Sequence, residues 1–384
     1  MREFLNTAAL AAQKSVIREY GALAAKTPGC IALTLGEPDF DTPVQIEEKV
    51  QDAFDAKETH YIANNGSMDL RRKIAAWEAE KNGMDYLPEE VVITAGATQA
   101  LFSVLFGILN PGDEVIVPTP AFVLYESITS LCRGKFVAMD ISEDGFQITK
   151  EKLMPLINEH TKAIVLNTPN NPTGCILSLE SLEVIRECVK DKGIFVICDD
   201  VYRQLCYGEK AHSFTEFKDM RKQTILVQSF SKPYAMTGWR MGYFCADMEV
   251  MERLELVHQY IVTSTPAPFQ RACMEALDFD PSEMLAEYDE RRQFVLKRLQ
   301  EIGMDCVTPE GAFYAFPSVE KYGLSSAEFC KRMITEAGLA VTPGFCFGSD
   351  KHIRISYCFA MDLIVEAMDR LEKFVNILKA EGRG

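Results

Sequence analysis

Short apolar runs alternate with longer stretches of mixed polarity between residues 90 and 247. The runs expected to be strands are 90–94, 114–117, 135–138, 163–166, 194–197 and 225–227. Several are apolar throughout, as strands buried on both faces are, and the segments between them are long enough for crossover helices. The pattern predicts an α/β region with a largely parallel sheet. In such sheets ligands bind beyond the carboxyl ends of the strands, so the residues after each strand are the first candidates for chemistry.

The pattern changes near residue 280, which predicts a second and smaller domain. A long charged stretch at 283–302 predicts a helix, and the run 352–356 predicts a late strand. A chain of 384 residues is long enough for two domains. We expect a large domain over 43–280 and a small α+β domain made of 1–42 and 281–384.

Charge and composition narrow the classes of function. A formal net charge of −16 disfavours binding to nucleic acid or to an anionic membrane surface. No apolar run approaches the roughly 20 residues that span a bilayer, and the N-terminus lacks a signal-peptide core. The twelve cysteines are scattered without metal-site spacing, and the five histidines form no HExxH motif. We therefore expect a cytoplasmic protein with reduced thiols and no metal.

Lys232 lies in the loop that follows the run 225–227, within the sequence Ser229-Phe230-Ser231-Lys232. A lysine is most often a solvated surface charge. In a loop of small polar residues after a buried strand, however, the amine can be partly desolvated. Desolvation lowers the pKa of the amine and makes it a nucleophile towards a carbonyl group.

Asp199 ends the strand predicted at 194–197 and is followed by Asp200-Val201-Tyr202. A carboxylate in this position either caps the next helix or pairs with a buried cation. A protonated pyridine nitrogen is such a cation, because it needs a carboxylate to stay charged. Tyr202 could donate a hydrogen bond to a phenolate oxygen of the same ring, or its hydroxyl could be satisfied by the backbone.

Two further loops follow predicted strands. The segment 94–100 leads into an apolar helix at 101–109, and free N–H groups at a helix N-terminus bind phosphate, although such turns are common in α/β proteins. Arg240 could add charged donors to the same phosphate. The loop 167–174 contains Asn171, whose amide could touch a ring substituent and a substrate carboxylate, or the loop could be turn chemistry alone.

Together these motifs resemble the class I, fold-type I aminotransferases that use pyridoxal 5'-phosphate (PLP), over nearly the whole chain. The matching segments, in order, are Gly36-Glu37-Pro38-Asp39-Phe40, Asn170-Asn171-Pro172-Thr173-Gly174, Asp199-Asp200-Val201-Tyr202, Ser229-Phe230-Ser231-Lys232 and Met236-Thr237-Gly238-Trp239-Arg240-Met241-Gly242. The resemblance implies an α/β fold with a mostly parallel, seven-stranded type of sheet and a smaller α+β domain. Asp200 is a departure, since relatives often carry Glu there, and we expect little effect because it is not a cofactor ligand.

The resemblance also implies a role for each matching residue. Lys232 would form the aldimine with PLP, Asp199 would pair with the pyridine nitrogen, and Tyr202 and Asn171 would contact the 3-oxygen. The phosphate would be bound by Ala97, Thr98, Ser229, Ser231 and Arg240, with Tyr61 reaching it from the other subunit of a homodimer. Phe122 would stack on the ring, unless it is ordinary core packing. Gly36, Asn171 and Arg354 would hold the substrate carboxylate, although an exposed Arg354 in a surface ion pair is the alternative.

The implied activity is transfer of an amino group from an L-amino acid to a 2-oxo acid such as 2-oxoglutarate, with ping-pong kinetics. Within the family, the stretches 257–260 and 311–318 resemble bacterial N-acetyl-LL-diaminopimelate aminotransferases and their aromatic- or aspartate-using relatives. A carbon–sulfur β-lyase of the same fold would use the same Lys and Asp, and its products, pyruvate and ammonia, would distinguish it. A PLP-sensing regulator would need a DNA-binding domain, for which the chain has neither the length nor the basic surface. A dehydrogenase would need a GxGxxG motif after the first strand, and none is found there, so both alternatives are disfavoured.

Overall fold

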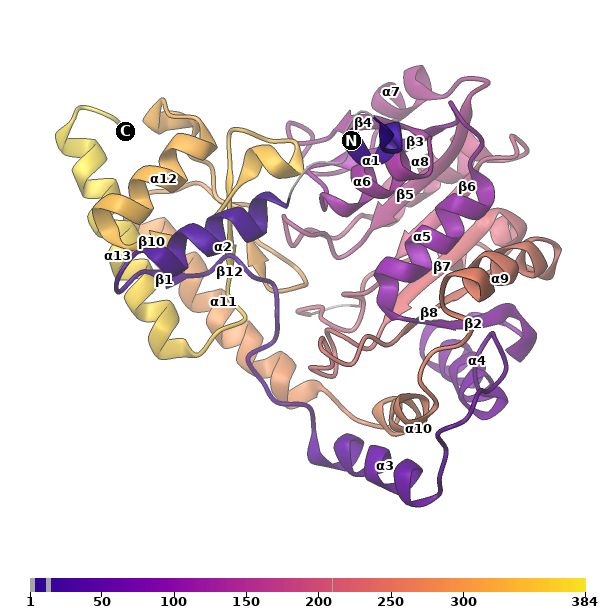
Figure 1. Ribbon diagram of the computed structural model, residues 1–384. Helices are drawn as coiled ribbons and strands as arrows, with labels where there is room; N and C mark the ends of the chain where they lie inside the picture. The colour runs from indigo at the N-terminus through magenta and orange to yellow at the C-terminus, as the bar shows by residue number, and fades with distance from the viewer. Residues whose placement is uncertain (1–3, 12–14, 209) are drawn as a thin grey trace.

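The computed structural model describes residues 4–11, 15–208 and 210–384. A seven-stranded sheet forms the core of the larger part of the molecule, on the right in Figure 1. In spatial order its strands are β2 (Val91–Thr94), β8 (Gly242–Cys245), β7 (Thr224–Ser229), β6 (Phe195–Asp199), β5 (Thr161–Asn167), β3 (Glu114–Thr119) and β4 (Lys135–Asp140). Neighbouring strands are parallel except at β8, which is antiparallel to β2 and β7. The six predicted strands and the mostly parallel sheet are confirmed.

Helices cover both faces of this sheet, because successive residues of each strand point to opposite sides and both sides are apolar. The helices around it are α3 (Val44–Asp55), α4 (Met68–Asn82), α5 (Gly96–Ile108), α6 (Leu124–Leu131), α7 (Lys150–Leu153), α8 (Leu179–Val189), α9 (Met248–Val262) and α10 (Ala267–Ala276). One face packs against α5, α6 and α9. The opposite face packs against α4, α8 and α10. Strands buried on both faces explain why their sequences read as continuous apolar runs.

A second group of elements lies beside the sheet, on the left in Figure 1. α1 (Thr7–Ala11) contacts α6 and lies with the larger part. The elements of the second group are α2 (Val16–Lys26), β1 (Ile31–Ala32), α11 (Ser282–Ile302), β9 (Tyr314–Ala315), α12 (Ser326–Ala337), β10 (Leu339–Ala340), β11 (Thr342–Pro343), β12 (Ile353–Ser356) and α13 (Met361–Ala380). Residues of α2, α11, α12 and α13 share a separate apolar cluster with β9, β10 and β12. The predicted late helix and late strand are confirmed as α11 and β12. The domain boundaries stay a prediction.

Three strand ends position polar side chains at one edge of the sheet. β5, β6 and β7 end at Asn167, Asp199 and Ser229, and Asn167 is the direct register partner of Asp199. β12 brings Arg354 towards the same edge from the smaller part of the molecule, where it pairs with Thr342 of β11. Across the described ranges, no helix combines the length and apolar character needed to cross a membrane.

Candidate active site

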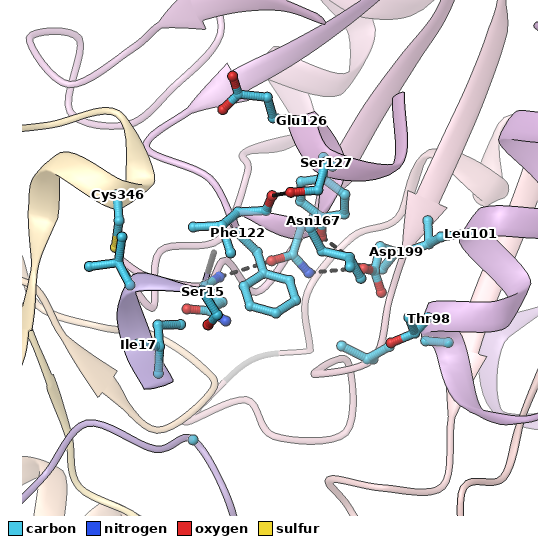
Figure 2. Close-up of a pocket in the computed structure, with 18 of the residues that line it drawn as sticks. Ser15, Ile17, Thr98, Leu101, Phe122, Glu126, Ser127, Asn167, Asp199 and Cys346 are labelled. Atoms are coloured by element: carbon cyan, nitrogen blue, oxygen red, sulfur yellow. Dashed lines mark hydrogen bonds between the residues drawn. The ribbon is translucent and has the colours of Figure 1, made fainter. Parts of the chain in front are cut away.

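A cleft of ≈ 1150 Å³ opens at the carboxyl ends of β5, β6 and β7. Its lining includes all but one of the predicted site residues: Gly36, Ala97, Thr98, Phe122, Asn171, Asp199, Tyr202, Ser229, Ser231, Lys232, Arg240 and Arg354. Figure 2 shows Ser15 and Ile17, at the start of α2, facing this cleft from one side and Thr98 of α5 from the other. The fold therefore gathers at one site residues that lie far apart in the sequence.

Asp199 is a buried carboxylate with an incomplete set of partners. Tyr125 donates a hydrogen bond to its Oδ2 at 2.7 Å. Its Oδ1 is buried and has no hydrogen-bond partner among the described residues. Burial raises the pKa of Asp199 to about 7, although the Tyr125 hydrogen bond acts in the opposite direction. Turns, and not a helix, follow β6, so the alternative that Asp199 caps a helix is wrong.

Lys232 is partly exposed in the cleft, and its Nζ donates a hydrogen bond to the backbone oxygen of Gly36 at 2.6 Å. Burial lowers the pKa of the amine to about 8. Cys358 and Glu37 act in the opposite direction but offset the effect of burial only in part. The amine can therefore lose its proton near neutral pH, which is what a nucleophilic lysine requires.

Tyr202 is 4% exposed, and its hydroxyl lies 2.8 Å from the hydroxyl of Tyr314. Its partner is thus another side chain and not the backbone carbonyl that we considered as an alternative. Burial and the neighbouring Tyr314 raise the pKa of Tyr202 well above its ordinary value. A neutral Tyr202 keeps its proton and remains a hydrogen-bond donor for a ligand in the cleft.

Arg354 is 1% exposed, so the alternative of an exposed arginine in a surface ion pair is wrong. Nη1 donates to Oδ1 of Asn171 at 2.8 Å, and Nη2 donates to the backbone oxygen of Thr34 at 2.5 Å. The Nε atom is buried without a partner in the described part of the chain. A buried guanidinium that carries spare donors and faces a cleft is well suited to bind a carboxylate. Asn171 accepts from Arg354 and keeps its own amide N–H groups for a ligand.

The start of α5 lies beside Arg240 at the wall of the cleft. The helix begins at Gly96, earlier than the predicted 101–109, so the N–H groups of Ala97 and Thr98 belong to its first turn and line the cleft. Gly96 has a φ of 75°, and a Cβ atom added there would lie 2.5 Å from Nη2 of Arg240. Only glycine allows this approach. A helix N-terminus beside a guanidinium is a strong site for phosphate.

The other predicted residues complete the walls of the cleft. Ser229 ends β7 and Ser231 follows it, and Oγ of Ser229 accepts a hydrogen bond from the backbone N–H of Ser231 at 3.1 Å. Phe122 is half-buried and meets Tyr125 edge to face at 6.2 Å, so one side of its ring borders the cleft. Among the described residues, no group of three His, Cys, Asp or Glu side chains could hold a metal ion.

Tyr61 is the predicted residue that the cleft does not include. Its side chain is 89% exposed. It therefore has no place in the site of its own chain, and its predicted role requires a second subunit.

Two tyrosines in contact with the site were not assigned a role from the sequence. Tyr125 is the only residue whose side chain bonds to the Asp199 carboxylate within the described ranges, and Tyr314 lies between Tyr202 and Arg354. Tyr125 follows Phe122 by three residues, so helical spacing could have placed both on one face. Nothing in the sequence around Tyr314 indicates its contact with Tyr202.

Known proteins are similar in sequence to this chain over most of its length. The family described as "Aminotransferase class I and II" matches residues 28–371. An aspartate aminotransferase of Pyrococcus abyssi is 40% identical over 369 residues, which cover 94% of this chain and 95% of the relative. A Bacillus subtilis protein named as a probable N-acetyl-LL-diaminopimelate aminotransferase is 37% identical over 381 residues, which cover 98% and 96% of the two chains.

A solved structure agrees with these matches. The aspartate aminotransferase of Thermotoga maritima superposes with a TM-score of 0.93 at 33% identity, and the match covers 97% of this chain and 100% of that one. With the seven-stranded sheet, this similarity confirms the predicted fold-type I architecture.

Proposed function

The chain belongs to the aminotransferase class I and II family and is an enzyme of the transaminase class, and we propose that it works with PLP held between Asp199 and Lys232. The relatives reported above are all aminotransferases, and nothing among them favours the β-lyase alternative. The single observation that carries the cofactor proposal is the Asp199 carboxylate, which is buried, faces the cleft and lacks a cationic partner in the described residues.

The chemistry of the lining fits this cofactor at three points. Asp199 would pair with a protonated ring nitrogen, and the first turn of α5 with Arg240 would hold the phosphate. Lys232, with its amine pKa of about 8, would react with the cofactor's carbonyl carbon. When bound, PLP supplies an electron-withdrawing ring that stabilises negative charge on the substrate's Cα.

We propose that Lys232 then serves as the base. With the cofactor and an amino acid bound, the free Nζ of Lys232 would take the proton from the substrate Cα and return it on the cofactor side. The hydrogen bond from Nζ to the backbone oxygen of Gly36 keeps the amine at this wall of the cleft. Tyr202, whose pKa is raised, would remain protonated and donate a hydrogen bond to the 3-oxygen, and the Asn171 amide would donate to it as well.

Arg354 and Asn171 would bind the substrate α-carboxylate. The buried Arg354 guanidinium presents its unpartnered Nε, and Asn171 ties the guanidinium to the loop after β5. Binding the carboxylate would also orient the Cα–H bond relative to Lys232, because the amino acid would then be held both at its carboxylate and at its α-amino nitrogen. The donors named for relatives are aspartate and an acylated diaminopimelate. We propose a donor of these types or an aromatic amino acid, with 2-oxoglutarate as acceptor.

The exposed tyrosines support a homodimer as part of the proposal. Tyr61 and Tyr260 are 89% and 84% exposed, and exposed aromatic side chains are typical of subunit interfaces. In a dimer, Tyr61 would reach the phosphate of the other subunit. We also place the protein in the cytoplasm, with no membrane or nucleic-acid partner, and propose the domain division at residues 43 and 281 expected from the sequence. Light scattering on the purified protein tests the dimer, and a monomer at micromolar concentration would contradict it.

Two experiments test the function. Purified protein loaded with PLP and treated with borohydride should carry the cofactor on Lys232, as peptide mass spectrometry can read directly, and Lys232→Ala should carry none. A spectrophotometric screen of amino donors with 2-oxoglutarate then identifies the substrate. Label on a different lysine, or release of pyruvate and ammonia without amino transfer, would contradict the proposal.

A further inference from the structure

Tyr314 lies where the two halves of the proposed site meet. It is in β9, pairs with Ser356 of β12 and is 1% exposed. Its side chain reaches the cleft, although the family resemblance assigns it no role. The other buried polar contacts of the cleft belong to residues already described.

Three contacts fix the Tyr314 side chain. Its hydroxyl lies 2.8 Å from that of Tyr202, and the Arg354 guanidinium lies over its ring at 4.5 Å from the centroid. A Cβ atom at Gly36 would overlap the Tyr314 hydroxyl, so the glycine leaves just enough space for it. The Tyr314 hydroxyl makes no other hydrogen bond in the described part of the chain. Its single proton and its lone pairs are therefore available only to Tyr202 or to a ligand.

We propose that Tyr314 is a positioning residue that donates its proton to the Tyr202 oxygen, so that the Tyr202 proton is directed to the 3-oxygen of the cofactor. This inference rests on the proposed function, because it assumes the cofactor. A phenol has one proton. If Tyr202 uses its proton to donate a hydrogen bond to the 3-oxygen, the short contact between the two hydroxyls is a hydrogen bond only when Tyr314 is the donor. Two hydrogen bonds in series polarise each other, so the second phenol strengthens the donation by the first.

The Tyr314 ring has a second and separable effect. It packs against the guanidinium of Arg354, which is also packed at 5.0 Å from the ring centroid of Phe347. The hydroxyl of Tyr314 therefore acts on the cofactor side, whereas the ring orients the residue that binds the substrate carboxylate. Tyr314→Phe removes the first contact and keeps the second, and Tyr314→Leu removes both.

The effect of the hydroxyl has a defined sign. The 3-oxygen carries the most negative charge when the nitrogen that links lysine and cofactor has lost its proton. Donation by Tyr202 stabilises that form and lowers the pKa of the linkage. Tyr314→Phe weakens this donation without removing it, so the pKa of the linkage should rise by about 0.2 to 0.5, less than the loss of a whole neutral hydrogen bond would give.

The test is an absorbance titration of the PLP-loaded protein against pH, with KM for the amino donor measured on the same samples. Tyr322→Phe is the matched control, because its hydroxyl is buried without a partner in the described residues and lies outside the cleft. We expect a raised linkage pKa in Tyr314→Phe with KM within about twofold, a raised pKa together with a several-fold higher KM in Tyr314→Leu, and no change in Tyr322→Phe.

An unchanged linkage pKa in Tyr314→Phe, or an equal change in Tyr322→Phe, would overturn the inference and leave the proposed function standing. A wild-type protein that shows no lysine-linked absorbance at any pH would overturn both. Circular dichroism of each variant shows whether it is folded. If Tyr314→Leu does not fold, the result for Tyr314→Phe alone still decides.

Discussion

Asp199 and Asp200 are adjacent and buried, yet they meet opposite environments. Asp200 is 1% exposed and pairs with Arg203 at 3.1 Å, and Arg203 also lies 3.3 Å from Glu216. Asp199 is 4% exposed and lines the cleft, where the neutral Tyr125 is its side-chain partner. Successive residues of an extended chain point to opposite sides, so one carboxylate reaches the ionic cluster and the other reaches the cleft.

The difference shows where the chain leaves a charge for a ligand to balance. A buried carboxylate is strongly unfavourable unless a cation or several hydrogen bonds compensate it. For Asp200 the protein itself provides the cation. For Asp199 it provides one phenol and, among the described residues, no cation. The Oδ1 atom of each carboxylate is buried without a hydrogen-bond partner there, so the missing cation is what sets Asp199 apart. A cationic ring nitrogen would complete the second pair, so we propose that Asp199 serves the function and Asp200 the stability of the protein.

The largest expected effect separates the two carboxylates by activity. Asp199→Asn should lower kcat/KM by about 10³-fold or more, equivalent to about 4 kcal/mol, because an amide cannot hold the ring nitrogen protonated. Asp200→Asn should lower it by less than about tenfold. Steady-state kinetics on both variants make the comparison. Equal losses would contradict the division of roles.

The next prediction concerns stability. Arg203→Met leaves the Asp200 carboxylate buried without its cation, so the free energy of unfolding should fall by about 3 to 5 kcal/mol. Urea denaturation of the cofactor-free protein measures it, and adding Asp200→Asn should restore part of the loss. A change below about 1 kcal/mol for the single variant would show that the cluster is not structural.

The pH dependence of stability should reveal Asp199 in the cofactor-free protein. Its folded pKa of about 7 lies above its ordinary value of 3.8. The folded state therefore holds this proton more tightly than the unfolded state, and ionisation costs stability as the pH rises from about 4 to 7. Relative to Asp199→Asn, the wild type should lose about 2 to 4 kcal/mol across that window and no more above it. If the difference in the free energy of unfolding between the wild type and Asp199→Asn does not change with pH, the pKa of Asp199 is not raised.

The smallest expected effect sharpens the account of Asp199 itself. Tyr125→Phe removes the hydrogen bond to Oδ2, so the ionised carboxylate becomes less stable and PLP should bind about five- to tenfold more weakly. The dissociation constant of PLP measures this loss, with Tyr322→Phe as a control that should bind normally. Unchanged affinity in Tyr125→Phe would show that the phenol does not support the carboxylate.

Much of the fold could be predicted because its strands are buried on both faces. A continuous apolar run as short as 163–166 is too short for a typical helix, so in an α/β pattern it indicates a buried strand. β8 was harder to predict, since it has four residues and its first, Gly242, is the last residue of the motif that ends in Arg240-Met241-Gly242. The start of α5 at Gly96 was also missed, because Ala95 precedes it and carries no capping side chain.

The candidate site could be predicted as a set of residues but not as a network. Asp199 and Lys232 follow strands, which is a local signal. The partners Tyr125 and Tyr314 are 74 and 112 residues away from the side chains they contact, Asp199 and Tyr202, and only the packed fold defines such pairs. The exposure of Arg354 was also open in the sequence, and β12 resolves it by placing the guanidinium inside the molecule.

The central claim is that the Asp199 carboxylate pairs with a protonated ring nitrogen of PLP. Nitrogen-15 NMR of protein loaded with ¹⁵N-labelled PLP tests this claim most directly. The chemical shift of the ring nitrogen reports whether that atom carries a proton. We predict a protonated nitrogen at neutral pH in the wild type and in Asp200→Asn, and an unprotonated one in Asp199→Asn. An unprotonated nitrogen in the wild type, or a protonated one in Asp199→Asn, would contradict the account.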